Sequence, residues 1–363
     1  MKEKILISVF NDISKDARVQ RQIQCLSQFY NLDLLCYGEC NLPNTNIINI
    51  SNNSKPSYVQ YIFNFIKIAI NDKYCAIYGN DYYSCLPMLF ICLFCDTKLI
   101  YDAHEVIFDS KELRDRIFSI IEKIFIKHTD LVICASKQRA KLMKEYYKLK
   151  SLPTVIRNIS KLQLSKLEFN QNEELVLNNN KIKVVYAGVL SKGRKLDLLV
   201  KTALKLGDRY SIIIIGNGDQ TLELQKIIKE LCIKNVFMLG AKNNTDLGNY
   251  ISKCDIGYLY YPSTNLNNIY CAPNKIYEYT SLGLPILSNN NVTMTKEITD
   301  NEIGKVFIEN INDKLTIDEM CKNIIEIYDN IDKYKDNAYR FSYNCSWDLE
   351  SETLYDAVRE VVD

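Results

Sequence analysis

This chain of 363 residues has few histidines, few glycines in its first half and almost no excess of either charge. It has two histidines, and its 45 basic residues nearly balance 44 acidic ones, leaving a formal net charge of +1. A chain without a strong net charge has no global attraction to nucleic acid, so we expect no nucleic-acid partner. Few histidines also limit the acid–base groups available for catalysis.

Long apolar runs are absent too. The run LPMLFICLFC (86–95) is too short to span a bilayer and predicts a buried helix. The apolar stretch after Met1 ends at Asn11, shorter than the core of a signal peptide. Thirteen cysteines in a chain of this size, without an export signal, favour reduced thiols. We therefore expect a cytoplasmic protein.

One segment departs from the even charge balance. Residues 137–150, KQRAKLMKEYYKLK, carry six basic residues and one acid. The ordinary interpretation is a solvated helix face. The alternative is peripheral contact with anionic head groups at the inner face of the cytoplasmic membrane.

Apolar strands alternate with helical patterns in both halves of the chain. Continuous apolar runs of this kind are typical of buried parallel strands, and the alternation predicts an α/β fold with helices on both faces of each sheet. We expect two Rossmann-like domains at 1–160 and 181–345, joined by a polar, asparagine-rich linker at 161–180. The chain ends in a predicted helix at 346–363, with Leu349, Leu354 and Val358 on one packed face.

Glycine is distributed unevenly between the halves. Only Gly38 and Gly79 of the twelve glycines precede residue 180. Because glycine allows the backbone to approach a phosphate closely, the second half is the better candidate for nucleotide binding. In the first half the stretch FNDISKD follows the first strand in place of G-x-G-x-x-G, so we expect no dinucleotide cofactor.

Two strand–turn–helix junctions in the second half could hold an anion. IIIIGNGDQ ends a strand with Gly216 and Gly218, although a plain tight turn gives the same pattern. AGVLSKGRKLDLL (187–199) places Arg194 between two lysines at a turn, where an arginine fork suits a diphosphate. A solvated basic loop is the alternative.

The stretch APNKIYEYTSLGLPIL (272–287) predicts a short helix beginning near Asn274. Asn274 and Lys275 would stand one turn before Glu278 on the same face. The amide groups at the helix start and Lys275 could face a phosphate, while Glu278 could accept hydrogen bonds from the two hydroxyls of a ribose. Gly283 suits the C-terminal cap. An exposed Lys–Glu pair is the alternative.

These segments together resemble a known family. AGVLSKGR, IIIIGNGD, NVFMLG, DIGYLYYP and APNKIYEYTSLGLP have the order and spacing of glycosyltransferases with the two-Rossmann GT-B architecture. The chain looks most like the family-4 retaining enzymes (glycosyl transferases group 1). DARVQRQIQCLS, IYDAHE and LVICASKQRAKLM in the first half, and the closing SWDLESETLYDAV, are similar too. The resemblance implies two domains facing a central cleft, with the last helix crossing back to the first.

The resemblance also implies roles for the matching residues. Glu278 would hold the donor ribose, and Arg194 and Lys275 would neutralise the diphosphate. The loops at Gly188 and at Gly216 and Gly218, together with Asn274, would approach the nucleotide. His104 would lie near the donor sugar, as a catalytic residue with Arg194, Lys275 and Glu278; a buried structural histidine is the alternative.

One position departs from the family pattern. Many relatives carry a second glutamate near the transferred sugar, and Tyr270 occupies that position here. We therefore expect Tyr270 on the donor-sugar side. The absence of a D-x-D triplet fits a site without a metal ion, in which basic residues and helix dipoles replace one. Neither a metal nor another cofactor is expected.

The resulting hypothesis is a retaining glycosyltransferase that uses a nucleoside-diphosphate sugar and a glycan or lipid-linked acceptor, in bacterial surface polysaccharide or lipopolysaccharide synthesis. Asp16, Arg18 and Asp81, at strand-end loops of the first domain, are candidates for acceptor contacts. Two alternatives stay open: a sugar-nucleotide epimerase of the same architecture, and a catalytically silent nucleotide-sugar-binding partner.

Overall fold

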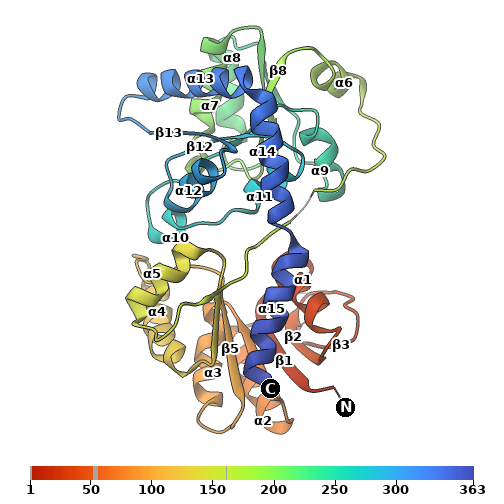
Figure 1. Cartoon of the computed structure of the whole chain (residues 1–363), viewed down its shortest axis with the longest axis vertical. Helices are drawn as coiled ribbons and strands as arrows, with labels where there is room; N and C mark the ends of the chain where they lie inside the picture. The colour runs from red at the N-terminus through yellow and green to blue at the C-terminus, as the bar shows by residue number, and fades with distance from the viewer. Residues whose placement is uncertain (1, 52–55, 161) are drawn as a thin grey trace. The chain divides into compact units, whose positions relative to one another are not determined.

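The computed structural model describes residues 2–51, 56–160 and 162–363. The chain divides into two compact units (Figure 1). The first comprises residues up to Asn158 together with Asn265–Asn267 and Trp347–Asp363. The second comprises Ile159–Thr264 and Asn268–Ser346.

The first unit is built on a seven-stranded parallel sheet in the order β3-β2-β1-β4-β5-β6-β7. Its central strands are almost wholly buried because helices cover both faces. The strands are β1 Lys4–Asp12, β2 Asn31–Tyr37, β3 Thr45–Asn49, β4 Ala76–Asn80, β5 Lys98–Ala103, β6 Leu131–Cys134 and β7 Thr154–Val155.

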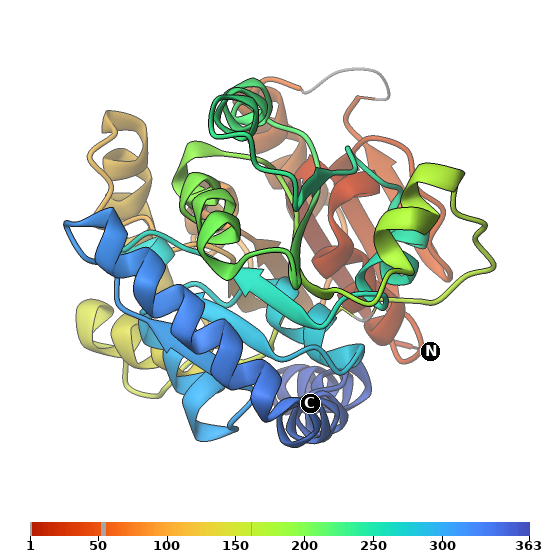
Figure 2. The same ribbon diagram turned by 90° about the horizontal axis from the view of Figure 1, so that it is seen from above.

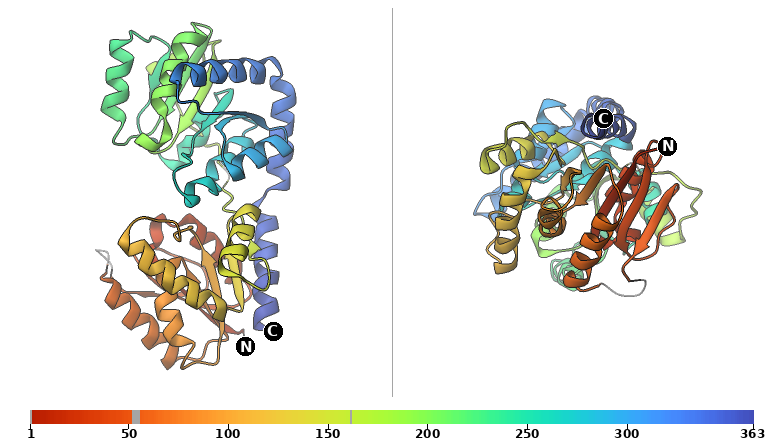
Figure 3. Two further views of the ribbon diagram at one scale, coloured as in Figure 1. Left: turned by 90° about the vertical axis from the view of Figure 1, so that its left-hand side faces the viewer. Right: turned by 90° about the horizontal axis from the view of Figure 1, so that it is seen from below.

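Two groups of helices cover this first sheet (Figure 3). Helices α1 (Ala17–Leu26) and α15 (Trp347–Val362) pack on one face, and α2 (Tyr58–Asn71), α3 (Cys85–Ile91), α4 (Leu113–Phe125) and α5 (Lys137–Tyr147) pack on the other. Three short 3-10 helices, η1 Ile13–Lys15, η2 Tyr82–Ser84 and η3 Ile126–His128, lie in the connections.

The second unit has a six-stranded parallel sheet in the order β10-β9-β8-β11-β12-β13. The strands are β8 Ile182–Ala187, β9 Tyr210–Ile215, β10 Val236–Met238, β11 Ile256–Leu259, β12 Ile286–Asn289 and β13 Gly304–Phe307. All six residues of β8 and of β9 are buried, as the unbroken apolar runs predict.

Helices line both faces of the second sheet (Figure 1 and Figure 2). One core includes side chains of α7 (Leu196–Leu206), α8 (Thr221–Glu230) and α13 (Asp313–Asp329). The other includes α6 (Gln171–Leu177), α9 (Asn244–Ile251), α11 (Asn274–Ser281), α12 (Val292–Asp300) and α14 (Ile331–Asn344). The short η4 (Lys192–Arg194) and α10 (Leu266–Ile269) lie in connections.

The predicted α/β class with two Rossmann-like domains is confirmed. The closing helix α15 packs on the first unit, where Leu354 and Val358 are buried. Glu350 attaches it: its Oε2 accepts a hydrogen bond from the Arg157 backbone N–H at 2.6 Å and its Oε1 one from Arg157 Nε at 2.6 Å. Leu349 does not join the packed face and is exposed, because five residues before Leu354 is roughly 140° around a helix.

The segment for which a linker is predicted, 161–180, carries the helix α6. Leu177 of this helix is buried in the core of the second unit, and Asn170 forms a capping box with Glu173 at its start. Within the described residues the segment therefore packs as part of the second unit, although its composition is polar.

Candidate functional site

Each sheet has a point where the strand order reverses. In the second unit the chain leaves β8 toward β9 and β10, then returns to the other side of β8 as β11. In the first unit the same reversal lies between β1 and β4. The loops at the carboxyl ends of the strands diverge at such points, which is where open α/β sheets bind ligands. The site residues predicted from the sequence follow these strands.

The glycines after β8 and β9 hold two loops against each other. A Cβ added to Gly216 would lie 1.9 Å from the Gly188 carbonyl oxygen, and one added to Gly218 would lie 2.3 Å from the Leu190 carbonyl oxygen. Gly216 also has a φ of +140°, and Gly188 donates its N–H to the Ile215 carbonyl at 2.9 Å. Glycine is therefore required at 216 and 218, because any Cβ there would prevent the backbone contact between the two loops of this unit.

Arg194 is held in place by two neighbours at the end of β11. Its Nη1 donates to the Tyr260 carbonyl oxygen at 3.0 Å, and its guanidinium lies 3.8 Å from the centre of the Tyr261 ring. Asn289 fixes Tyr261 in turn, donating to its carbonyl at 2.8 Å and accepting from its N–H at 2.9 Å. Arg194 is half-buried and stacked on an aromatic ring, so the N–H donors of its guanidinium that are not used in the bond to Tyr260 keep a fixed orientation.

The helix predicted in APNKIYEYTSLGLPIL is α11, and it begins at Asn274 as expected. Its N-cap residue is Pro273, and no described side chain caps the helix, so its first amides keep their positive potential. Gly283 ends it with a φ of +73°, as the C-terminal cap pattern predicts.

Tyr279 fastens this helix to the sheet. Its hydroxyl accepts a hydrogen bond from the Ala187 N–H at the end of β8, at 3.0 Å. Its buried ring lies against Gly257 of β11, where an added Cβ would come within 2.3 Å of Cδ2. The anchor therefore sets α11 beside the two strands at the reversal point.

Lys275 and Glu278 form the ion pair that was the ordinary interpretation of this helix, yet the pair is not exposed. Lys275 Nζ lies 2.5 Å from Glu278 Oε2, and the side chains are 22% and 12% exposed. Ser160 Oγ donates to the other carboxylate oxygen, Oε1, at 2.8 Å. Because Lys275 and Glu278 are partly desolvated and held in place, each of them can exchange its present partner for a charged or polar group of a ligand.

Arg194 lies against the Tyr261 ring, and the charge of Glu278 acts on the same residue. Burial raises the pKa of Tyr261, the positive charge of Arg194 lowers it, and Glu278 raises it. The charges of the cation predicted for a diphosphate and of the carboxylate predicted for a ribose therefore both act on Tyr261. Tyr270 lies in the turn between α10 and α11 and is half-buried.

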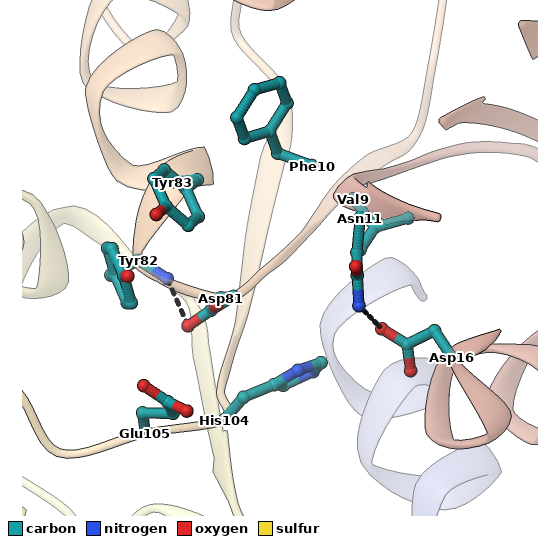
Figure 4. Close-up of a pocket in the computed structure, with 9 residues that line it drawn as sticks. All are labelled: Val9, Phe10, Asn11, Asp16, Asp81, Tyr82, Tyr83, His104 and Glu105. Atoms are coloured by element: carbon teal, nitrogen blue, oxygen red, sulfur yellow. Dashed lines mark hydrogen bonds between the residues drawn. The ribbon is translucent and has the colours of Figure 1, made fainter. Parts of the chain in front are cut away.

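In the first unit the reversal point holds a pocket of about 230 Å³ (Figure 4). Figure 4 shows Asp81 and His104 in its middle, the two tyrosines on one side, and the hydrogen-bonded Asn11 and Asp16 on the other. Aromatic faces and several carboxylates in one hollow suit a ligand rich in hydroxyl groups. The lining residues are Val9, Phe10, Asn11, Asp16, Asp81, Tyr82, Tyr83, His104 and Glu105.

Asp81 occupies this pocket in a strained conformation. Its φ of 62° and ψ of 164° belong to a region used almost only by glycine. Its carboxylate accepts the Tyr82 N–H at 2.8 Å, and burial raises the pKa of the carboxyl to about 6. Strain of this kind persists where the surrounding structure demands a particular side-chain direction.

His104 is supported from below by Asp102, a buried carboxylate. The distance from His104 Nε2 to Asp102 Oδ2 is 3.5 Å, and the Asn80 Oδ1 atom lies 3.3 Å from the same nitrogen. Burial lowers the pKa of His104, but the charge and hydrogen bond of Asp102 outweigh it, so the net shift is upward.

The structure corrects the prediction that Arg18 contacts an acceptor. Arg18 is 6% exposed, and its Nε and Nη2 donate to the two oxygens of Asp102 at 2.9 and 2.8 Å. Burial alone would raise the pKa of Asp102, yet Arg18 and His104 hold it well below its usual range. Arg18 thus supports His104 through Asp102, because its long side chain reaches from the start of α1 to the end of β5.

The sequence predictions missed Ser160, Tyr261 and Asn289 in the second unit and Asp102 in the first. Tyr261 and Asp102 stood in quoted strand-end motifs, DIGYLYYP and IYDAHE, so their position at the end of a parallel strand was the available signal. Ser160 lies 118 residues before Glu278, and nothing local marks it.

Over its whole length the chain resembles the Anabaena protein HepE, solved in complex with UDP-glucose, with a TM-score of 0.73, 15% identity, and coverage of 98% of this chain and 99% of that one. This likeness defines the fold as the GT-B class of paired Rossmann-like domains. Residues 168–341, just under half of the chain, match the family described as glycosyl transferases group 1.

Two curated relatives are similar over part of the chain. An uncharacterized glycosyltransferase of Methanocaldococcus jannaschii is 25% identical over 213 residues, which is 56% of this chain and 48% of the relative. The O-antigen biosynthesis glycosyltransferase WbnH of Escherichia coli is 26% identical over 252 residues, 69% of this chain and 66% of the relative. The chain thus spans about half to two thirds of the curated relatives it matches.

Proposed function

We propose that the protein is a glycosyltransferase that moves a sugar from a nucleoside-diphosphate sugar to a glycan or lipid-linked saccharide. The observation that carries the proposal is the reversal point of the second sheet, where the end of β11 holds an oriented arginine and α11, anchored to β8 by Tyr279, carries a partly buried Lys–Glu pair.

The second unit supplies the donor side. Arg194, Lys275 and the uncapped start of α11 bind the diphosphate, and Glu278 accepts hydrogen bonds from the ribose hydroxyls. The glycine loops at Gly188 and Gly216 approach the nucleotide. In support, HepE was solved with UDP-glucose, and the relative WbnH is named for O-antigen synthesis.

The pocket of the first unit receives the acceptor. Asp16 and Asp81 line it and can accept hydrogen bonds from sugar hydroxyls, while Tyr82 offers an aromatic face. Its acidic lining favours a neutral sugar at this position over one that carries a carboxylate or phosphate, because like charges repel. The reaction then belongs to the synthesis of a bacterial surface polysaccharide or lipopolysaccharide.

The reaction breaks the bond between the sugar's anomeric carbon and the diphosphate oxygen and forms a bond to the acceptor hydroxyl oxygen. With retention, the hydroxyl attacks from the face that the diphosphate leaves, and its proton passes to the departing phosphate oxygen. The basic groups stabilise the negative charge that develops there. Because they neutralise the diphosphate, we expect activity to survive removal of divalent ions by EDTA.

Thermal unfolding with UDP, GDP, ADP and CMP, and then with sugar conjugates, tests the donor site, since a ligand stabilises the folded state in proportion to its binding free energy. The nucleotide with the largest shift is then used in a donor-hydrolysis assay. Hydrolysis above background that disappears in Glu278→Ala supports the proposal. Unchanged nucleotide affinity in both Glu278→Ala and Arg194→Ala would show that the site is wrongly placed.

Two outcomes would favour the other functions. Formation of an epimeric sugar nucleotide without acceptor would identify an epimerase. Tight nucleotide-sugar binding with neither hydrolysis nor transfer to any saccharide would identify a silent binding partner. Proton NMR of the product's anomeric centre distinguishes retention from inversion.

A further inference from the structure

The pocket at the reversal point of the first sheet offers many hydrogen-bond acceptors. Three carboxylates line it, those of Asp16, Asp81 and Glu105, and none of the described lining residues is a lysine or an arginine. One oxygen of Asp81 accepts the Tyr82 N–H at 2.8 Å, and the other has no hydrogen-bond partner among the described residues. Glu105 is exposed. Carboxylate oxygens are therefore available to a ligand in this pocket.

Hydrogen-bond donors are fewer, and those of two lining side chains are already engaged. The side-chain amide of Asn11 donates to Asp16 Oδ2 at 3.1 Å. His104 Nε2 lies 3.3 Å from Asn80 Oδ1 and 3.5 Å from Asp102 Oδ2. A sugar hydroxyl both donates and accepts, whereas an ammonium group has three N–H donors and no acceptor. An ammonium group therefore matches the acceptor-rich lining better than a hydroxyl does.

The charge of the pocket is unbalanced in the same sense. Of the described lining residues, only His104 can carry a positive charge. Behind it Asp102 and Arg18 form an ion pair at 2.8 Å and cancel each other, so negative charge stays in excess even when the imidazole is protonated. Burial and the charge of Glu105 raise the pKa of Asp81 to about 6, against the opposing charge of His104. A cation bound beside Asp81 would offset this repulsion.

Aromatic rings supply a second kind of contact for a cation. Tyr82 and Tyr83 line the pocket beside Asp81 (Figure 4), with their ring centres 4.3 Å apart. Phe10 lies against Tyr83, with 5.2 Å between the ring centres, so the rings are packed in place. The face of an aromatic ring attracts a cation and also packs against the apolar face of a sugar. The rings therefore favour a positively charged sugar independently of the carboxylates.

A metal ion is a poorer occupant of this pocket. The described His, Cys, Asp and Glu side chains form no group of three or more that could hold one. The carboxylates instead surround a volume of about 230 Å³, which has room for a small organic molecule. A protonated amine on a sugar fits this arrangement, because the ring fills the volume while the amine meets the carboxylates.

We propose that this pocket binds a sugar with a free amino group, whose ammonium faces Asp81 and Glu105 and whose ring lies against Tyr82. The remaining hydroxyls face Asp16, which lines the other side of the pocket (Figure 4). The proposal rests on sugar transfer by this protein, since the amino sugar is the acceptor of that reaction. The amine itself does not react: the new bond forms to a hydroxyl oxygen, and the ammonium keeps its three protons.

Binding measured without any donor tests the proposal. The probes are methyl glucosides with an amino group at carbon 2, 3, 4 or 6, each compared with its N-acetyl form and with methyl glucoside itself. Ligand-observed NMR titration with the full chain gives the dissociation constants. We expect at least one amine to bind roughly tenfold more tightly than its neutral counterparts, and high salt to reduce this advantage. None of the described helices is long and apolar enough to cross a membrane, and the probes are soluble in water.

Two variants and a control assign the effect to the pocket. Glu105→Gln changes an exposed position and should lose several-fold of the preference for the amine, and Asp81→Asn/Glu105→Gln should lose nearly all of it. Both should bind methyl glucoside like wild type, because the amides keep an acceptor oxygen for hydroxyl groups. The matched control Glu145→Gln/Glu352→Gln removes two exposed carboxylates from α5 and α15 of the same unit and should keep the full preference. Circular dichroism verifies the fold, and Glu105→Gln keeps the comparison valid if the double variant unfolds.

Nucleotide-induced thermal shifts separate this proposal from the donor site. If a nucleotide binds but no amine has an advantage, or if the control variant loses that advantage as the pocket variants do, the amino-sugar proposal is overturned and sugar transfer stands. If an amine binds selectively and no nucleotide binds, sugar transfer is refuted and the preference of the pocket for a cation stands. With an active donor, kcat/KM should be roughly tenfold higher for the amine than for its N-acetyl form, mainly through a lower KM. Equal values would also overturn the proposal.

Discussion

Replacing Glu278 by glutamine should weaken nucleotide binding only when the ribose carries its hydroxyl groups. Hydrogen bonds to a charged group contribute about 1.5–3 kcal/mol each, and glutamine keeps one neutral acceptor of similar shape. In the free protein the carboxylate already has Ser160 and Lys275 as partners, so the ribose gains less than the full amount. Releasing Lys275 also strengthens its attraction to the diphosphate. We therefore expect a net loss of about 1.5–2.5 kcal/mol, roughly 10- to 70-fold in Kd.

Isothermal calorimetry with two ligands measures this loss. The first ligand is the nucleoside diphosphate that gives the largest thermal shift, and the second is its 2′,3′-dideoxy analogue. If Glu278 binds the ribose, the glutamine variant loses affinity for the first ligand and little for the second, and the difference is the coupling energy. The control is Glu230→Gln, which breaks the exposed pair of Lys226 and Glu230 on α8 and should change neither affinity.

Equal losses for both ligands would refute the reasoning, because Glu278 would then act through the position of α11 or through Lys275 and not through the ribose hydroxyls. Affinity for the diphosphate that stays within twofold of wild type would refute it as well. Lys275→Ala gives the complementary result: its loss should be the same for both ligands, and it should shrink when the diphosphate is replaced by the monophosphate.

Three further changes test the supporting structure. Gly257→Ala puts a Cβ 2.3 Å from the buried ring of Tyr279 and should lower the free energy of unfolding by about 1–3 kcal/mol in a urea titration, with weaker nucleotide binding. Burial raises the pKa of Glu122 to about 7, above its ordinary 4.5, so its contribution to stability is complete below pH 4.5 and is lost as the pH rises through 7. Glu122→Gln should therefore reduce the fall in unfolding free energy between about pH 5 and pH 8 by up to about 3 kcal/mol, measured by urea unfolding across that range; an unchanged pH profile would contradict this. Asp81→Gly should relieve backbone strain and raise the unfolding free energy by about 1 kcal/mol while transfer to the acceptor falls; lower stability would mean that the conformation is not strained.

The arrangement of the two sheets follows from the sequence because it depends on local patterns. Unbroken apolar runs predict the strands β1, β8 and β9, and apolar residues at helical spacing predict α7 and the helices around it. The strands β3, β7 and β13 carry no such run, and they have two to five residues each. Strands this short at a sheet edge bury too few side chains to leave a periodic signal, and their pairing depends on neighbours distant in the sequence.

The relative positions of the candidate residues on α11 were predictable for the same reason. Asn274, Lys275, Glu278 and Gly283 lie within one short helix and its cap, so their relative positions follow from helix geometry. What could not be predicted is the state of the ion pair. Whether Lys275 and Glu278 are exposed or desolvated depends on Ser160 and on the anchor that Tyr279 makes to β8, and neither has a fixed spacing from the helix.

The first-unit pocket shows where local patterns stop being informative. Its polar residues come from the ends of three strands that are adjacent in the sheet but distant in the chain, and the carboxylate that organises them, Asp102, is fully buried. Arg18 looked like a surface charge because it follows a strand-end loop. Its guanidinium instead neutralises Asp102, which would otherwise carry an unpaired charge in the interior at a cost of several kcal/mol. The same pairing leaves Asp102 ionised beside His104, so that imidazole is held in one orientation at the pocket floor. Removing the Arg18 charge should therefore act on His104 before it acts on any acceptor, and Arg18→Met should change the pH dependence of transfer more than the KM for the acceptor.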